Sequence, residues 1–255
     1  VVVVVLLLLV VVDNLIIMAV SQRVVKLYFD PLSPFAYFAH REIQKTLLPM
    51  VRKENSGLSF EYKPVVLAGL LKHFGQLGPA EIPTKRAFTY QFAQWYADSN
   101  SIPFSFPDAH PFNPIPLLRT AVPAVEGEVV SAGGGGERGE RGVKRVLEFV
   151  WRDGGHPSDE ERLKELRKEL GVSEDDVTSQ KTKQQLIQNG EEAVKEGAFG
   201  VPILAVSSSS SSSPSLFWGN DAVHMCLDYL NGDELFHSEK YERLSSLPQA
   251  ATRKK

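Results

Sequence analysis

The chain has 255 residues, 43% of them hydrophobic and 23% charged, a composition typical of a globular protein large enough for a substantial core. Its 28 Lys and Arg residues and 31 Asp and Glu residues give a formal net charge of -3, which argues against a nucleic-acid partner, since such a partner needs clustered positive charge. A single cysteine, Cys226, excludes an intrachain disulfide and a cysteine-based zinc site. The histidines show no pairing at metal-ligand spacing, and we expect no metal.

Residues 1–20 form an atypical apolar segment. The run VVVVVLLLLVVVDNLII is interrupted by Asp13 and Asn14, whereas a membrane span needs roughly 18 to 20 apolar residues in a row. The run also lacks the basic start of a signal peptide. We expect no stable membrane insertion and a native product that begins near Met18; a degenerate membrane or targeting anchor is the alternative.

The next part of the chain predicts a strand, a helix and a second strand. Residues 24–30 (VVKLYFD) are rich in β-branched and aromatic residues, as in a buried strand. From Ser33 onward apolar residues recur at helical spacing, with Pro34 suited to the first turn and Asp30 or Ser33 as a cap. Residues 58–65 alternate and predict the second strand. This order favours a parallel α/β unit.

Residues 67–197 predict helices and loops, with few strand signals. One helical segment carries an aromatic stripe of Phe88, Phe92, Trp95 and Tyr96. We expect four of its aromatic residues to be core or interface residues rather than a cofactor site: Phe88, Tyr90, Phe92 and Trp95. Another begins with a capping box from Ser158 to Glu161 and ends at Gly171. The stretch SAGGGGERGERG has the composition of a flexible linker.

Strand patterns return only at residues 201–206 and 215–219. The serine run between them should loop out at a hairpin turn without breaking the sheet. A last helix follows, in which we expect Asn220 to act as the cap and Cys226 to be a buried, inert thiol.

Together these elements predict an α/β protein with a thioredoxin-like fold and an inserted all-helical domain. The discontinuous thioredoxin-like domain covers residues 21–66 and 198–236, the helical insertion domain 67–197, and a C-terminal tail 237–255. In this fold a loop before a cis-proline faces the N-terminus of the first helix. Pro202, which leads directly into a strand, is the candidate for that proline.

Four sequence blocks carry a family resemblance: LYFDPLSPFAYFA, GPAEIPTKRAF, IPFSFPDAHPFNPIPLLR, and GAFGVPIL with LFWGNDAVHMCLDYL. In this order they resemble the kappa-class glutathione transferases and the 2-hydroxychromene-2-carboxylate isomerases, which are DsbA-like proteins with serine in place of the redox cysteine. The similarity spans residues 24–232 apart from the two linker-like stretches and a variable helical part. The blocks distinguish transferase from isomerase less cleanly, although the first and third look closer to the isomerase branch.

The resemblance implies a glutathione-dependent isomerase with glutathione transferase activity, acting on a small aromatic or electrophilic substrate. Free N–H groups and the positive dipole end of a helix stabilise an anion at its N-terminus. There Ser33 would donate a hydrogen bond to the glutathione sulfur; its alternative role is a helix cap alone. A kappa-type transferase and a non-catalytic DsbA-like peptide-binding module are the alternative functions, and the lack of a cysteine near Ser33 argues against a redox enzyme.

Further roles follow by matching the blocks. Pro34 and Phe35 would flank the thiolate. Gln76 stands where the family often has Asn that contacts substrate or glutathione, and Lys85 would lie near a carboxylate of glutathione or an acidic substrate, unless it is a solvated surface residue. His110, in the block DAHPF, is a weaker candidate for lining the active site.

The late blocks supply the rest of the implied glutathione site. Val201, just before Pro202, would pair its backbone with the cysteinyl group of glutathione as an added strand does. Asn220 and Asp221 would bind the γ-glutamyl end, with Asp221 meeting the ammonium group, a role that can coexist with capping. The family also implies a homodimer. A cytoplasmic location is expected, with mitochondria or peroxisomes as alternatives.

Overall fold

A computed structural model of the protein describes residues 22–208 and 213–251. The apolar segment predicted for residues 1–20 lies outside these residues. Within the described part of the chain, no helix is both long enough and apolar enough to cross a membrane.

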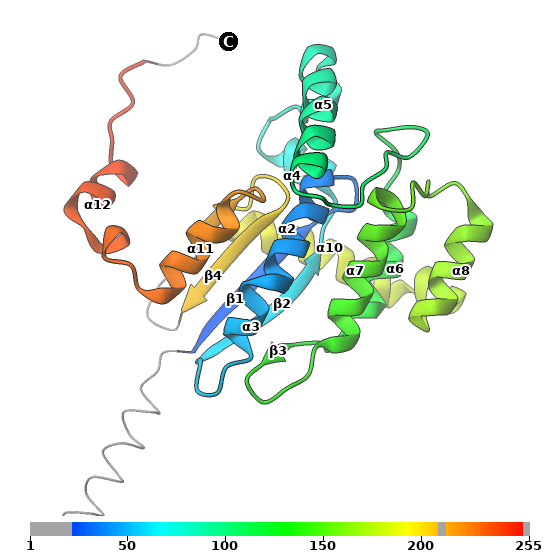
Figure 1. Cartoon of the computed structure of the whole chain (residues 1–255), viewed down its shortest axis with the longest axis horizontal. Coiled ribbons are helices and arrows are strands. Elements are labelled where there is room, and N and C mark those ends of the chain that lie inside the picture. Colours follow the sequence, from blue (N-terminus) through cyan, green and yellow to red (C-terminus); the bar gives the residue numbers. More distant parts are fainter. Residues whose placement is uncertain (1–21, 209–212, 252–255) are drawn as a thin grey trace, which may run out of the picture.

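A mixed sheet of five strands, in the order β3-β2-β1-β4-β5, forms the centre of the fold (Figure 1). The strands are β1 (Arg23–Phe29), β2 (Leu58–Pro64), β3 (Val130–Ser131), β4 (Ile203–Ser208) and β5 (Ser215–Trp218). β1 and β2 are parallel, as the strand–helix–strand pattern predicts, and the other neighbours are antiparallel. The register pairs Tyr28 with Ile203 and Ile203 with Trp218. The ends of β1, β2 and β5 and the start of β4 therefore meet at one end of the sheet.

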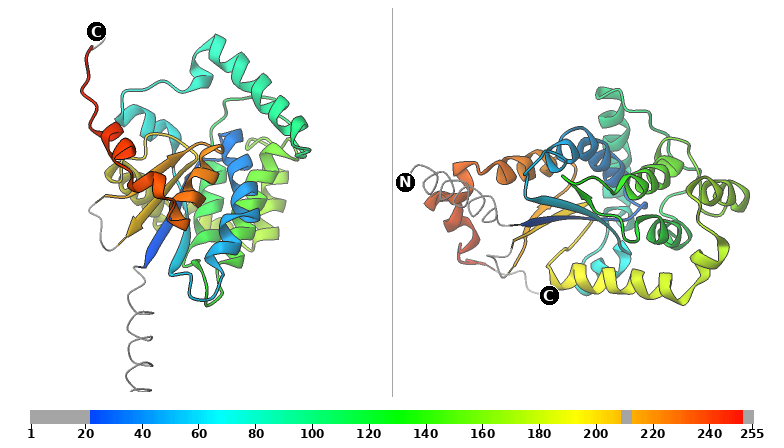
Figure 2. Two further views of the ribbon diagram at one scale, coloured as in Figure 1. Left: turned by 60° about the vertical axis from the view of Figure 1, so that its left-hand side comes forward. Right: turned by 90° about the horizontal axis from the view of Figure 1, so that it is seen from below.

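The helices lie on both faces and at one edge of this sheet. In chain order they are α2 (Pro34–Lys45), α3 (Leu47–Val51), α4 (Leu67–His73), the 3-10 turn η1 (Pro79–Glu81), α5 (Pro83–Ser99), α6 (Ile115–Val125), α7 (Glu137–Trp151), α8 (Glu160–Leu170), α9 (Glu174–Thr178), α10 (Gln180–Lys195), α11 (Ala222–Asn231), η2 (Glu234–His237) and α12 (Glu239–Ser245). Viewed from below, α2 and α11 cover one face of the sheet and α10 covers the other (Figure 2). α5 stands apart from the sheet beyond its upper end (Figure 1).

The two faces of β1 explain this layering. Val25, Leu27 and Phe29 are fully buried in the larger hydrophobic cluster, which includes residues of α2, α7 and α11. Tyr28, which points to the opposite face because strand side chains alternate, is buried in a second cluster with Ala193 of α10. A strand with buried side chains on both faces must be covered by helices on both sides, as in α/β folds.

The inserted region differs from the all-helical prediction at β3. This two-residue strand pairs antiparallel with β2, matching Ser59 with Ser131 and Phe60 with Val130. Two residues are too few to produce the alternation by which a strand is recognised in a sequence. The predicted domain boundaries stay predictions.

The glycine-rich stretch is not a linker over its whole length, because α7 begins at Glu137 within it. A Cβ atom at Gly139 would lie 2.7 Å from the Cβ of Glu128, and one at Gly142 would lie 2.7 Å from the Cβ of Ala124. Ala124 belongs to α6, so these glycines allow α6 and α7 to pack closely. The composition suggested flexibility, whereas the residues serve a helix contact.

The predictions for the hairpin, the ends of α8 and the C-terminal tail have different outcomes. β4 and β5 form the expected antiparallel hairpin, with Val206 paired to Ser215 across the serine run. Gly171 ends α8 with φ +65° as predicted, but Asp159 rather than Ser158 caps the helix, accepting a hydrogen bond from the Arg162 backbone N–H. The C-terminal tail predicted for residues 237–255 includes the helix α12.

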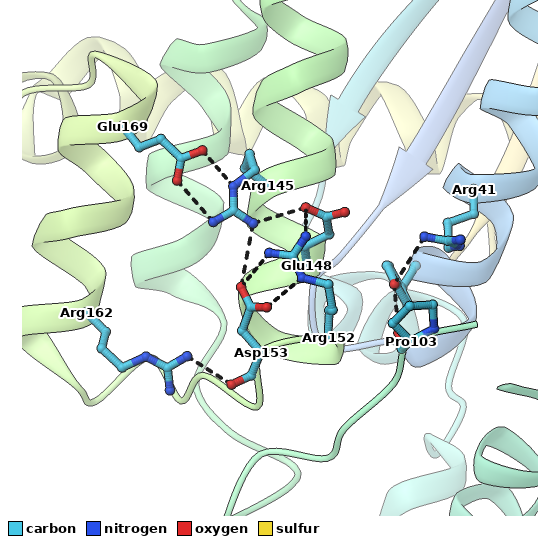
Figure 3. A network of polar contacts seen from close by, with 9 residues as sticks. Arg41, Pro103, Arg145, Glu148, Arg152, Asp153, Arg162 and Glu169 are labelled. Carbon is cyan, nitrogen blue, oxygen red and sulfur yellow. Dashed lines mark hydrogen bonds and ion pairs between the residues drawn. The ribbon is translucent and has the colours of Figure 1, made fainter. Parts of the chain in front are cut away.

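A network of ion pairs fixes the end of α7 to α8 (Figure 3). Arg145 of α7 binds both carboxylate oxygens of Glu169 of α8, at 2.7 and 3.0 Å, and also Glu148. Arg152 pairs with Glu148 at 2.8 Å and with Asp153 at 2.6 Å. Arg152 and Asp153 follow directly after Trp151, the last residue of α7.

Candidate functional site

Ser33 lies at the N-terminus of α2, at the end of a short loop that follows β1. It is the N-cap residue, with extended backbone angles (φ −93°, ψ 120°), and only 8% of it is exposed. Its backbone N–H donates to the Asp30 carbonyl at 3.0 Å, and its hydroxyl makes no capping hydrogen bond. Of the two predicted caps, Ser33 is confirmed as the N-cap residue and Asp30 is not, because its carboxylate accepts from Leu32 and Leu67. The Ser33 hydroxyl makes no hydrogen bond with the described residues.

The Asp30 carboxylate ties the loop to α4. It is fully buried and accepts the backbone N–H groups of Leu32 and Leu67, each at 2.9 Å. Burial raises the pKa of Asp30 to about 7, although both hydrogen bonds act in the opposite direction. The loop before Ser33 and the first residue of α4 thus share one buried acceptor.

The carbonyl groups of the same loop are held by two aromatic side chains. The indole Nε1 of Trp151 donates to the Pro31 carbonyl at 2.8 Å, and Nε2 of His110 lies 2.8 Å from the Leu32 carbonyl. Because a carbonyl can only accept, Nε2 of His110 carries the proton. Nδ1 is then an acceptor in the neutral ring, and the Tyr90 hydroxyl, which has one proton to donate, lies 2.7 Å from Nδ1 and 2.8 Å from the His110 carbonyl. Burial lowers the pKa of His110, which favours this neutral form.

Val201 and Pro202 lie at the same end of the sheet as this loop, since β4 runs antiparallel to β1. The Val201–Pro202 peptide bond is cis, as the sequence suggested. The Pro202 carbonyl accepts from the Gly219 N–H at 3.0 Å. Val201 is buried, yet its backbone N–H and carbonyl form no hydrogen bond with the described part of the chain. They remain available to an added strand.

Asn220 and Asp221 follow β5 at this end of the sheet. Asp221, not the predicted Asn220, is the N-cap of α11, and its side chain makes no capping bond. A Cβ atom at Gly219, where φ is +99°, would collide with Oδ1 of Asp221, so glycine is required for this turn. Within the described residues the exposed Asp221 carboxylate has no ion-pair partner.

Aromatic rings extend outward from the start of α2. Phe35 lies 6.0 Å from Phe92 of α5, and Phe92 lies 6.1 Å from Phe88 and 5.6 Å from Trp95 between ring centroids. Phe88 is 67% exposed and Trp95 59%, so these two rings are not core, whereas Tyr96 packs against the larger hydrophobic cluster. We call Phe88, Phe92 and Trp95 the α5 aromatic surface.

The remaining predicted residues have different outcomes. Pro34 is buried as the first residue of α2. Gln76, after α4, and Lys85, in the first turn of α5, are exposed, and no described contact joins either to Ser33; their binding roles stay predictions. The buried thiol of Cys226 is confirmed, since burial raises its pKa to about 12. Among the residues described, no cluster of His, Cys, Asp or Glu has the arrangement of a metal site.

Sequence reasoning missed the roles of Trp151 and Tyr90. Trp151 lies 120 positions from Pro31, and Tyr90 acts through His110, 20 positions away. No local pattern marks either residue, although the block DAHPF drew attention to His110 itself.

Comparison with known proteins bears on the family. A 2-hydroxychromene-2-carboxylate isomerase from Pseudomonas sp. (strain C18) is 24% identical over 82% of this chain and 91% of its own length. The glutathione S-transferase kappa 2 of Caenorhabditis elegans is 25% identical over 82% and 92%, respectively. The solved structure of a 2-hydroxychromene-2-carboxylate isomerase shares the fold, with a TM-score of 0.65, 22% identity, and coverage of 89% of this chain and 100% of that one. The model of the DSBA-like thioredoxin domain matches residues 24–231. The chain therefore belongs to the family of DSBA-like thioredoxin domains.

Proposed function

We propose that this protein is a glutathione-dependent isomerase of the 2-hydroxychromene-2-carboxylate isomerase type, with glutathione transferase activity at the same site. The observation that carries the proposal is the uncommitted hydroxyl of Ser33 at the N-terminus of α2. A helix N-terminus stabilises an anion, and a hydroxyl held there can donate to a thiolate. Serine cannot itself form a disulfide, so the thiolate must come from a ligand.

Three groups at this end of the sheet fit the parts of glutathione. The Ser33 hydroxyl can donate to the sulfur. The unpaired backbone groups of Val201 can bind the cysteinyl peptide unit, and the exposed Asp221 carboxylate can meet the ammonium group of the γ-glutamyl end. Gln76 and Lys85 are proposed to contact the remaining polar groups of glutathione or of an acidic substrate.

Glutathione would supply a nucleophilic thiolate that adds reversibly to a conjugated carbon of a chromene carboxylate and is released unchanged after ring opening and bond rotation. The protein's part is to lower the free energy of the thiolate relative to the thiol. Ser33 and the positive dipole end of α2 would do this without moving, because the loop is already held by Asp30, His110 and Trp151. The α5 aromatic surface, which begins beside Phe35, would receive the aromatic ring of the substrate.

A titration tests the proposal. Adding the protein to glutathione at neutral pH should increase the ultraviolet absorbance of the thiolate, and Ser33→Ala should abolish this increase. Turnover of the chromene carboxylate should fall about 100-fold, as when one donor to a developing anion is removed. Glutathione affinity should change little, because the other contacts remain.

Ser179→Ala is the matched control, since Ser179 caps α10 through a 3.0 Å bond from the Thr182 N–H. This variant should lose about 1 kcal/mol of stability and keep full activity. Ser33→Ala should behave in the opposite way, because its hydroxyl caps nothing. Absence of glutathione binding and of thiolate formation would leave the peptide-binding module as the better reading.

The kappa-type transferase alternative is supported by the Caenorhabditis elegans relative. Isomerisation returns glutathione unchanged, whereas transfer consumes one thiol for each product. Counting free thiols during turnover of a chromene carboxylate, and then of an aromatic electrophile, separates the two activities at this site.

A further inference from the structure

A groove between α4, α6 and α10 contains a cavity of about 660 Å³. None of the residues assigned above to the Ser33 site lines it. Its apolar lining is aliphatic, without Phe, Tyr or Trp: Val66, Leu70, Ile115, Leu186, Ile187 and Val194. We call it the α4–α10 groove. Ile187 is 60% exposed there.

Arg119 of α6 lines the groove and lacks a partner. Its Nε atom is buried without a hydrogen bond, and no ion pair or hydrogen bond joins the guanidinium to any described residue. Arg167, from the neighbouring α8, is satisfied by contrast: it lies 3.3 Å from the Thr120 hydroxyl and 2.6 Å from the Glu174 carboxylate. A guanidinium without a carboxylate partner among the described residues can bind one that a ligand brings into the groove.

The other charged groups of the groove are Lys183 and Glu191 of α10 and His73 of α4. Neither Lys183 nor Glu191 forms an ion pair within the described part of the chain. Arg119, Lys183 and Glu191 together give the groove a net charge of one positive unit. An anionic group therefore suits it better than a cationic one.

Two helix glycines leave room for a ligand. A Cβ atom at Gly69 of α4 or at Gly190 of α10 would meet nothing within 4 Å, and neither glycine has a positive φ. Packing and backbone conformation therefore do not demand glycine at either position. The absent side chains widen the groove between the two helices.

We propose that the α4–α10 groove binds a small molecule with an unbranched alkyl chain and one terminal carboxylate, held by Arg119. The aliphatic walls match an alkyl chain, the cavity volume lies within the range of small-molecule sites, and the forked guanidinium matches a carboxylate. The site is independent of the proposed glutathione chemistry, since it shares no residue with it.

Calorimetric titration of the full chain with decanoate, below the concentration at which it forms micelles, tests the headgroup. Decanoate should bind at one site per chain. Decylamine should bind at least about tenfold more weakly, which corresponds to about 1.4 kcal/mol of binding free energy. Arg119→Met should weaken decanoate by a similar factor and leave decanol unchanged. Arg41→Met is the matched control, because the Arg41 Nε is also buried and unpaired but lies outside the groove. Equal loss in both variants would overturn the proposal.

Gly190→Leu tests the location. The new side chain enters open space and favours the helix, so the variant should fold with an unchanged or higher Tm and lose decanoate binding, whereas Gly190→Ala should lose only part of it. Unchanged affinity in Gly190→Leu would overturn the site. Displacement of decanoate by glutathione would assign the ligand to the Ser33 site instead. If Gly190→Leu changed the oligomeric mass of the protein but not its affinity for decanoate, the groove would be a contact between two copies of the chain, and the proposal would be wrong.

Discussion

The loop of residues 30–33 and the α5 aromatic surface lie next to each other but are built in opposite ways. In the loop, groups from three separate parts of the chain hold the polar atoms: the Leu67 backbone N–H donates to the Asp30 carboxylate, Trp151 to the Pro31 carbonyl and His110 to the Leu32 carbonyl. On α5, Phe88 and Trp95 are more than half exposed and contact mainly other rings. The side that positions the thiolate is thus preorganised, whereas the side that would receive the substrate is open. A fixed nucleophile beside an adaptable surface is a physical basis for accepting several aromatic substrates.

Trp151→Ala tests this contrast with the largest expected effect on stability. Trp151 is fully buried, stacks on Phe104 at 5.7 Å and donates to the Pro31 carbonyl. We expect a loss of about 3–5 kcal/mol of unfolding free energy, measured by urea denaturation. Trp95→Ala is the control for residue type, and should change stability by less than about 0.5 kcal/mol because the ring is exposed. Similar losses in both would contradict the contrast.

Asp30→Asn tests the buried carboxylate through pH. A folded pKa raised to about 7 means that the stabilising protonated form is complete below the ordinary value of 3.8 and is lost as pH rises through 7. The unfolding free energy of the wild type relative to Asp30→Asn should therefore fall between about pH 4 and 7, by up to about 1.4 kcal/mol per pH unit.

The buried His40, whose pKa is lowered to about 3, makes stability fall as pH drops below 6.5, and it acts in the opposite direction in the same window. Since both proteins contain His40, its effect cancels in the difference. A difference that is flat from pH 4 to 7 would show that the Asp30 carboxyl titrates as in water.

His110 is a positioning residue, and paired substitutions test it. His110→Leu leaves the Leu32 carbonyl without its donor, which costs about 1–3 kcal/mol. We expect kcat to fall about tenfold or more and the pKa of bound glutathione to rise, with a smaller change in KM. His110→Gln can still present an N–H near the Nε2 position and should restore much of kcat. Equal loss in both variants would mean that the ring matters only for packing.

Phe88→Ala should give the smallest effect on stability and the most selective effect on function. With 67% of the side chain exposed, we expect the unfolding free energy to change by less than about 0.5 kcal/mol. KM for an aromatic substrate should rise about three- to tenfold, while glutathione binding is unchanged. Leu244→Ala, on the exposed side of α12, is the control and should alter neither quantity.

Much of the fold was predictable because local pattern decides it. β1 and β2 were recognisable from β-branched and alternating residues, and the antiparallel hairpin from two short strands around a serine run. β3 was not, because its two residues pair only after β2 is in place. Gly139 and Gly142 were misread as linker residues, because composition cannot reveal that a second helix lies against them.

The candidate site divides in the same way. Ser33, next to Pro34 at the start of a helical pattern, could be identified from sequence, as could the cis bond before Pro202. Exposure of the aromatic stripe could not, because an amphipathic pattern shows only that a face is apolar and not what covers it. The contact between the Asp30 carboxylate and the Leu67 N–H, which helps to hold the loop before Ser33, could not be predicted either.

By itself, the sequence determined the strand–helix–strand unit, the serine at the helix N-terminus and the absence of a nearby cysteine, since each depends on residue types and on neighbours in the chain. Only the tertiary structure decided that Trp151, His110 and Asp30 hold one loop, that Phe88 and Trp95 of α5 face solvent, and that the Arg119 Nε is buried without a partner among the described residues. These properties depend on contacts between residues far apart in the chain. Whether a side chain is buried, and whether a donor has an acceptor, is defined only in the folded chain.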